Sequence, residues 1–198
     1  MRKLSFLLTA FFAVAAFVSF GNVNAKEGLA VGATMESFKL TDASGVAKSF
    51  DELKGKNGAI LVFLSVQCPV VKGYDARIVK LAAEYEAKGI NVIGINSNST
   101  EAMEKVKAHA GENYKFPVLI DKGNVLADRL GANVTPEVYY LNAKNVLVYH
   151  GAIDNDKKGE NITSNFLRDA VESNLSGKAV AKTSANAFGC SIKRAAKE

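Results

Sequence analysis

The amino-acid sequence predicts an α/β fold in which a mostly parallel sheet is covered by helices on both faces. One observation is the continuous apolar run AILVFLSV at residues 59–66, which is typical of a central strand buried on both sides. Another is the change of period that follows. Apolar residues recur at three- and four-residue steps from Val70 to Lys88, which indicates an amphipathic helix that Gly89 ends. Further strands and helices alternate beyond it, as in chains built on a parallel sheet.

The same hydrophobic patterns predict a strand, helix or turn for each segment along the chain. The predicted elements are a hairpin at 38–50 around the turn at 42–45, the strand at 59–66, the helix at 70–88, a strand at 90–95, a helix capped by Ser99, a strand at 116–120, a short helix at 125–130 closed by Gly131, a hairpin at 138–150 and a helix from about 164 to 175. Residues 178–198 show no clear period, and the sequence leaves open whether this extended tail packs on the domain or stays mobile.

The N-terminus has the pattern of a cleaved signal peptide. Arg2 and Lys3 precede an apolar run from Leu4 to Phe20, which is shorter than the ~20 residues of a membrane span. Val23-Asn24-Ala25 then offers small residues for cleavage after Ala25. We therefore expect a signal peptide at 1–25, one domain at 26–177 and a tail at 178–198. The mature protein is expected in the periplasm or secreted, without membrane association.

Charge and cysteine content exclude several classes of function. The net charge of +5 falls to +3 without the leader and is spread along the chain, so no basic stripe for nucleic acid is expected. The chain has two cysteines, Cys68 and Cys190, and two histidines, His109 and His150. Their spacing fits no metal site, and we expect no metal or other cofactor. Both histidines are expected to be solvated or structural, and the triplet at 161–163 matches a glycosylation acceptor only by chance.

Cys68 is the strongest candidate for chemistry. Cys68-Pro69 falls where the buried strand ends and the long helix begins, and proline is favoured at the first helical position. The sulfur would therefore lie near unpaired N–H groups and the positive end of the helix dipole, which stabilise a thiolate. Lys72 adds a positive charge one turn later. The alternatives are that Cys68 is an inert buried residue, or half of a structural disulfide with Cys190, 122 residues further on.

These residues carry a resemblance to a known family. The run LVFLSVQCPVVKGYDARI, then GANVTPEVYYLN and a hairpin ending HGAID, resembles the thioredoxin superfamily, in its redoxin branch related to alkyl hydroperoxide reductase and thiol-specific antioxidant proteins. The closing GCSIK at 189–193 is similar to exported bacterial members. The resemblance implies a three-layer sandwich with a mixed central sheet and an N-terminal hairpin. It also implies a thiol oxidoreductase or peroxidase in which Thr135 precedes a cis-proline, Pro136, that faces Cys68 and shapes the substrate groove.

The chain departs from both of its nearest patterns. A thioredoxin-type pair would have a second cysteine at position 71, where this chain has Val71. In the peroxiredoxin pattern Ser65 and Cys68 fit, but Leu61 replaces the proline. No arginine follows Thr135-Pro136, and Arg77 on the long helix is the possible substitute. These departures predict slow peroxide turnover and measurable disulfide reduction.

Three hypotheses remain open. In the first, Cys68 attacks a peroxide or a disulfide and Cys190 resolves the intermediate. In the second, an external thiol resolves Cys68 and Cys190 is incidental. In the third, the chain is a non-catalytic binding module with a structural Cys68–Cys190 disulfide. Each enzymatic version needs a peroxide or disulfide substrate, which can be a protein, and a thiol protein as reductant.

Overall fold

The computed structural model describes residues 28–196, so the predicted signal peptide at 1–25 lies outside the described residues. The strands are β1 (Lys39–Asp42), β2 (Ala47–Ser49), β3 (Gly58–Leu64), β4 (Ile90–Asn96), β5 (Val118–Ile120), β6 (Val134–Thr135), β7 (Glu137–Asn142), β8 (Leu147–Gly151), β9 (Ser184–Ala185) and β10 (Cys190–Ser191). The helices are α1 (Phe50–Leu53), α2 (Pro69–Glu86), α3 (Met103–Asn113), α4 (Val125–Leu130) and α5 (Phe166–Leu175), with a 3₁₀ turn at Lys122–Asn124.

Within this part of the chain, eight strands form one sheet in the order β2-β1-β5-β4-β3-β7-β8-β9. Pairing is parallel between β3 and β4, between β4 and β5, and between β8 and β9, and antiparallel elsewhere. The central sheet is therefore mixed, as the family resemblance implied, and the parallel strands predicted from the alternating pattern form its middle. β6 and β10 make a separate two-stranded ladder.

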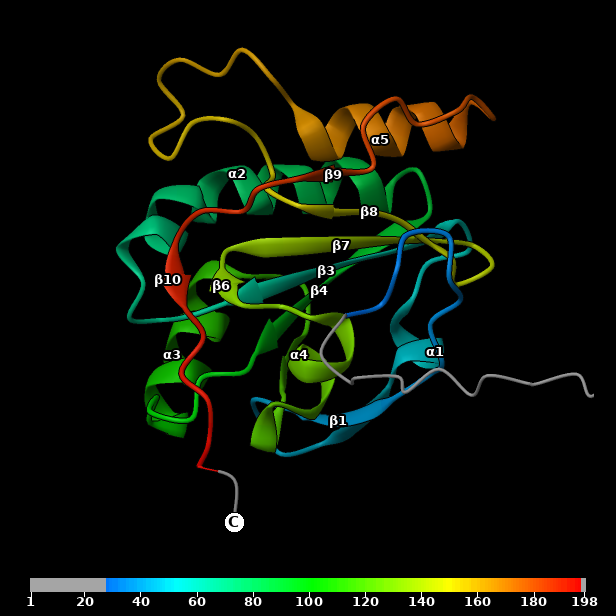
Figure 1. Ribbon diagram of the computed structural model, residues 1–198. Helices are drawn as coiled ribbons and strands as arrows, with labels where there is room; N and C mark the ends of the chain where they lie inside the picture. Colours follow the sequence, from blue (N-terminus) through cyan, green and yellow to red (C-terminus); the bar gives the residue numbers. More distant parts are fainter. Residues whose placement is uncertain (1–27, 197–198) are drawn as a thin grey trace, which may run out of the picture.

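Two hydrophobic clusters make the molecule a three-layer sandwich, with helices on both sides of the sheet (Figure 1). On one face, Val71, Tyr74 and Ile78 of α2 pack with side chains of α5 and with Ile60 and Val62 of β3. On the other face, residues of α1 and α4 pack with the alternate residues of β3. β3 is buried along its whole length, as its apolar run predicted. The junction between β3 and α2 is therefore fixed by packing on both faces of the sheet.

Two local predictions were wrong for identifiable reasons. Phe50 was assigned to the hairpin but begins α1, because Ser49 and Glu52 form a capping box in which each side chain accepts the other's backbone N–H. Ser99 does not cap α3, which begins at Met103 after Ala102. The N–H of Ser99 donates instead to the carbonyl of Lys193 in the tail, at 2.9 Å.

The tail is part of the fold. After α5 it adds β9 to the edge of β8, crosses the start of α2 and ends with β10 beside β6 (Figure 1). The sequence left open whether the tail packs on the domain or stays mobile. Up to residue 196 it packs on the domain. No helix among the described residues is long and apolar enough to cross a membrane.

Candidate active site

Cys68 occupies the N-cap position of α2, and Pro69 is the first helical residue. The place predicted from the sequence is thus the place observed. Its thiol is only 1% exposed and belongs to the hydrophobic cluster under α2. No side-chain hydrogen bond caps this helix, and the N–H of Val71 in its first turn reaches the Cys68 sulfur.

The turn before Cys68 is fixed by a carboxylate that the sequence analysis overlooked. Glu101 Oε1 accepts hydrogen bonds from the Ser65 hydroxyl at 2.5 Å and the Gln67 N–H at 3.0 Å. Glu101 Oε2 accepts from the Val66 N–H at 3.3 Å and the Asn96 amide at 2.6 Å. Because it fits the peroxiredoxin pattern, Ser65 was expected among the residues that form the groove and support the Cys68 thiolate. Its hydroxyl is instead committed to Glu101, so it acts on the turn that carries Cys68.

The second wall of the site comes from β6. The Thr135–Pro136 peptide bond is cis, as the family resemblance implied. The Cys68 thiol donates to the carbonyl oxygen of Thr135, with 3.3 Å between Sγ and O. The backbone just before Pro136 therefore faces the sulfur.

β10 brings the second cysteine to this wall. It pairs antiparallel with β6, in a register that sets Cys190 opposite Thr135 and Ser191 opposite Val134. The approach is close, because a Cβ built on Gly189 would lie 1.9 Å from the Thr135 oxygen. Only glycine permits this contact. The two cysteines, 122 residues apart in sequence, are both free thiols and share Thr135 as a neighbour.

The pKa values of the two thiols are shifted in opposite directions. Burial would raise the pKa of Cys68, but hydrogen bonds to its sulfur from the Cys190 thiol, the Val71 N–H and the Thr135 side chain outweigh burial and lower the pKa. Burial, the hydrogen bond to Cys68 and the nearby negative sulfur raise the pKa of Cys190 to about 11. The arrangement therefore favours a thiolate at Cys68 and a protonated thiol at Cys190.

The predicted low pKa of Cys68 is thus confirmed in direction, but only part of the expected cause applies. The Val71 N–H belongs to the first turn of α2, so the helix terminus contributes as expected. Lys72 is exposed on the helix, and the main causes of the lowered pKa of Cys68 are other groups. The largest cause that lowers the pKa is the hydrogen bond from the Cys190 thiol, a contribution that the sequence analysis did not include.

Arg77 is not a substitute for the peroxiredoxin arginine. Its guanidinium lies 2.6 Å from the Asp154 carboxylate and covers the ring of Tyr74. Its other hydrogen bonds go to the backbone oxygens of Gly73, Asp156 and Lys157. Arg77 therefore fixes the loop after β8. Within residues 28–196 it makes no hydrogen bond to Cys68.

The histidines take no part in the site. His150 stacks on Tyr139 at 5.5 Å between ring centroids, a structural role that fits the expectation. His109 was expected to be solvated, but it packs edge-on against Tyr114 and lies 3.5 Å from the Asp75 carboxylate. The described residues contain no group of three or more His, Cys, Asp or Glu side chains that could hold a metal ion.

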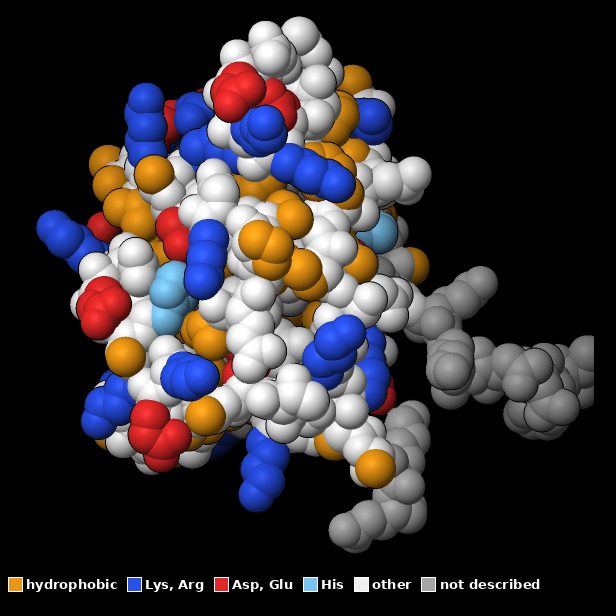
Figure 2. Space-filling model, turned by 90° about the vertical axis from the view of Figure 1, so that its left-hand side faces the viewer, with side chains coloured by type: hydrophobic (Ala, Val, Ile, Leu, Met, Phe, Trp, Pro, Cys, Tyr) orange, Lys and Arg blue, Asp and Glu red, His pale blue; other side chains and the backbone are white. Residues whose placement is uncertain are grey.

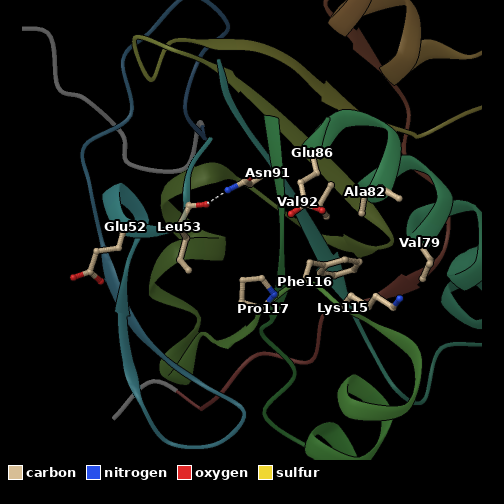
Figure 3. A pocket seen from close by; sticks show the side chains of 11 residues that line it. Glu52, Leu53, Val79, Ala82, Glu86, Asn91, Val92, Lys115, Phe116 and Pro117 are labelled. Carbon is tan, nitrogen blue, oxygen red and sulfur yellow. Dashed lines mark hydrogen bonds between the residues drawn. The ribbon is translucent and has the colours of Figure 1, made fainter. Parts of the chain in front are cut away.

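A separate cavity of about 320 Å³ lies at the amino-terminal ends of β4 and β5, where Val92, Phe116 and Pro117 form apolar walls (Figure 3). Glu86 and Lys115 stand at its margin. None of its lining residues belongs to the cysteine site, which adjoins the carboxyl end of β3. The two cysteines therefore form the candidate active site without it.

A profile of the AhpC/TSA family matches residues 31–155, which include β1 to β8 and Cys68. The chain belongs to the AhpC/TSA family. Among relatives of this AhpC/TSA protein, the thiol-disulfide oxidoreductase ResA of Halalkalibacterium halodurans is 29% identical over 134 residues, 67% of this chain and 74% of the relative.

Solved structures agree with the family. A hypothetical protein from Sinorhizobium meliloti 1021 superposes with a TM-score of 0.78 at 32% identity, over 86% of this chain and 98% of that one. The thioredoxin domain of a thiol-disulfide oxidoreductase from Bacteroides vulgatus has a TM-score of 0.54 at 18% identity, over 62% of this chain and 89% of that domain, which shows the fold alone. The AhpC/TSA chain is thus a thioredoxin-like, thiol-dependent oxidoreductase, acting on either disulfides or peroxides.

Proposed function

We propose that this protein catalyses thiol–disulfide exchange, with Cys68 as the nucleophile and Cys190 as the resolving cysteine. One observation carries the proposal. The β6–β10 register sets Cys190 opposite Thr135, whose carbonyl oxygen lies 3.3 Å from the sulfur of Cys68. A cysteine missing from position 71 is thereby replaced by one supplied from the tail.

The reduction of a substrate disulfide takes two steps. The Cys68 thiolate attacks a substrate disulfide, forming a mixed disulfide and releasing one substrate thiolate. The Cys190 thiol then loses its proton to solvent, and its sulfur attacks Cys68, forming the Cys68–Cys190 disulfide and releasing the second substrate thiolate. The substrate gains two electrons and, once protonated, two protons. A dithiol reductant protein restores the starting state.

The pKa pattern supports this order of events. Cys68 is the better nucleophile at the start, because its pKa is lowered while that of Cys190 is raised to about 11. The charge on Cys68 disappears once it enters the mixed disulfide. One cause of the raised pKa of Cys190 is then gone, so Cys190 becomes more acidic when it is needed as the second nucleophile.

Disulfides are proposed as substrates in preference to peroxides. Leu61 replaces the peroxiredoxin proline, and Arg77 is held by Asp154 away from the sulfur. The relative named ResA is a thiol-disulfide oxidoreductase, in agreement with this choice. We place the reaction in the periplasm or outside the cell, because residues 1–25 have the pattern of a cleaved signal peptide.

The test is the oxidation of the reduced protein by one equivalent of diamide, followed by peptide mapping without reduction. We expect a linked pair of fragments containing Cys68 and Cys190, within one chain on non-reducing electrophoresis. Insulin reduction should vanish in Cys68→Ser. In Cys190→Ser, a mixed disulfide on Cys68 should accumulate, because the first step remains and the second is lost.

Other outcomes decide between the alternatives. If Cys190 stays free in the diamide-treated wild type, and if Cys190→Ser still turns over normally, the monothiol scheme replaces this one. If both thiols are inert to insulin and to peroxide, the domain is a binding module. Peroxide turnover at the rate of dedicated peroxidases would overturn the choice of disulfide as substrate.

A further inference from the structure

The segment 187–195, here called the C-terminal strap, pairs with β6 beside Cys68, opposite the Thr135 carbonyl that faces the sulfur. Its strand β10 occupies the free edge of β6. The Ile192 N–H donates to the Asn133 carbonyl at 2.9 Å and continues the pairing. Cys68 beneath is 1% exposed. Figure 2 looks onto this side of the molecule, where hydrophobic side chains gather at the centre with Lys and Arg side chains around them.

Backbone hydrogen bonds hold much of the strap, and two of its side chains add to them: Phe188 packs against Tyr74, and the Arg194 guanidinium donates to the Ala132 carbonyl oxygen. The Lys193 N–H donates to Asn98 Oδ1 and its carbonyl accepts from the Ser99 N–H, both at 2.9 Å. The Ala195 N–H donates to Asn124 Oδ1 at 2.7 Å. Ile192 is the one side chain of the strap that is fully buried, at 6% exposure. Such a segment can open with a much smaller free energy than the core requires.

A protein substrate needs the space that the strap occupies. In a disulfide the two Cα atoms lie about 4.4–6.8 Å apart, so a partner cysteine bonded to Cys68 brings its backbone close to this sulfur. On the β6 side that space is taken by Cys190, which pairs with Thr135. Extended segments bind exposed strand edges through their main chain. The edge of β6 at Thr135 suits such a segment, but β10 is already paired with it.

We propose that the C-terminal strap is a displaceable occupant of the β6 edge, which competes there with an extended, cysteine-bearing strand of a partner protein. This inference rests on the proposed function. The closed form shields the Cys68 thiolate from bulky disulfides. A partner strand gains access by pairing with β6 in place of β10.

The return of the strap then couples two events. After Cys68 attacks the partner, its sulfur is bonded to a partner sulfur and one partner thiolate has left. When β10 returns to β6, Cys190 is brought back to Cys68 and attacks it, and the second partner thiolate leaves. The partner strand loses its covalent bond and its pairing edge in the same step.

Gly189 allows this mechanism to be tested without removing either cysteine. In Gly189→Ala the new Cβ would lie 1.9 Å from the Thr135 oxygen and 2.7 Å from its carbonyl carbon, both backbone atoms that cannot move aside. The strap should lift from β6. Gly111→Ala is the matched control, because a Cβ at Gly111 meets nothing within 4 Å.

The readout is alkylation of Cys68 in the reduced full-length protein, quantified by mass spectrometry of the peptide that contains it. A polyethylene glycol maleimide of about 5 kDa serves as bulky probe and iodoacetamide as small probe. We expect Gly189→Ala to raise the rate with the bulky probe by roughly tenfold or more, the effect of about 1.4 kcal/mol of lost docking. The rate with iodoacetamide should rise less, and Gly111→Ala should match the wild type with both probes.

Resolution supplies a second, independent readout. The mixed disulfide of Cys68 with a cysteine peptide should persist several times longer in Gly189→Ala, because Cys190 returns less often. Equal alkylation rates with the bulky probe in the wild type and in Gly189→Ala would overturn the strap proposal. Ile192→Ala, which weakens docking without a clash, should show the same change to a lesser degree and guards against misfolding of Gly189→Ala.

The two proposals fail in different ways. If diamide links Cys68 to Cys190 but strap variants leave bulky-probe alkylation unchanged, the redox pair stands and the strap proposal is wrong. If strap variants expose Cys68 but no Cys68–Cys190 disulfide forms, the strap covers the site and the proposed function is wrong.

Discussion

The two cysteines lie side by side but are held by different kinds of structure. Cys68 sits where a strand buried along its whole length meets an 18-residue helix, with apolar layers on both sides. Cys190 sits in a strand of two residues, held by backbone hydrogen bonds and a few side chains of the strap, of which Ile192 alone is buried. Rigid support suits a nucleophile whose pKa depends on exact donors, and a removable support suits a thiol that acts only in the second step.

The sharpest test of this contrast compares two isoleucines. Ile78 of α2 is 1% exposed, and Ile78→Ala should lower the free energy of unfolding by about 2–5 kcal/mol, as large-to-small changes in cores do. Ile192→Ala should cost distinctly less, because the strap can detach while the core stays folded. Urea unfolding followed by circular dichroism measures both. Equal losses would show that the strap unfolds only together with the core.

Glu101 tests whether the turn before Cys68 needs its polar support. In Glu101→Gln one amide nitrogen must face two hydrogen-bond donors, since each carboxylate oxygen now accepts two. We expect a loss of stability of about 1–3 kcal/mol. The midpoint of the pH dependence of Cys68 alkylation by iodoacetamide should also shift. Glu112→Gln, on the exposed side of α3, is the control and should alter neither. An unchanged midpoint would confine Glu101 to a structural role.

The coupling of the two thiols predicts a pH effect with a definite sign. In Cys68→Ala the hydrogen bond and the negative charge that raise the pKa of Cys190 are removed. Burial still raises this pKa, and the Val70 N–H and Lys193 oppose it. The pKa of Cys190 should therefore fall below its value of about 11 in the wild type. Iodoacetamide alkylation of the single remaining thiol, followed from pH 7 to 11, measures it. A midpoint as high as in the wild type would mean that Cys68 does not act on Cys190.

The smallest effect is expected at the outer end of the strap. Arg194 forms a 2.9 Å ion pair with Asp128, in which both side chains are partly exposed, and its guanidinium also donates to the Ala132 carbonyl oxygen. Arg194→Ala should reduce the stability by no more than about 1 kcal/mol. The alkylation of Cys68 by the bulky maleimide should rise only slightly. A change as large as that of Gly189→Ala would mean that the strap is fastened at its end and not at β6.

Periodic patterns made most of the fold predictable. The apolar run of β3 and the three- and four-residue spacing in α2 led to Cys68 at their junction. A strand buried on both faces gives a continuous apolar run, whereas a helix buried on one face gives a periodic one. The closing Gly131 of α4 was found in the same way, and it has the expected left-handed conformation, with φ of 77°.

The rest of the site has no comparable pattern in the sequence. β10 has two residues, too few for an alternating pattern, so the tail could be recognised neither as a strand nor as the partner of β6. Glu101 serves a turn 34–36 residues earlier in the chain, and only the packing of the elements brings it there. The opposite pKa shifts of the thiols depend on that same long-range packing.

The separation of 122 positions between Cys68 and Cys190 also couples redox state to resistance against unfolding. In a CxxC site the disulfide closes a loop of a few residues and restricts the unfolded chain very little. A Cys68–Cys190 bond ties most of the domain into one ring, and chain-entropy arguments assign such a ring about 4–5 kcal/mol. By linkage, a fold that holds the two thiols together favours their oxidation by the same amount. The oxidised protein would be the form that best withstands heat, denaturant and proteolysis, and the reductant would have to supply that difference at every turnover.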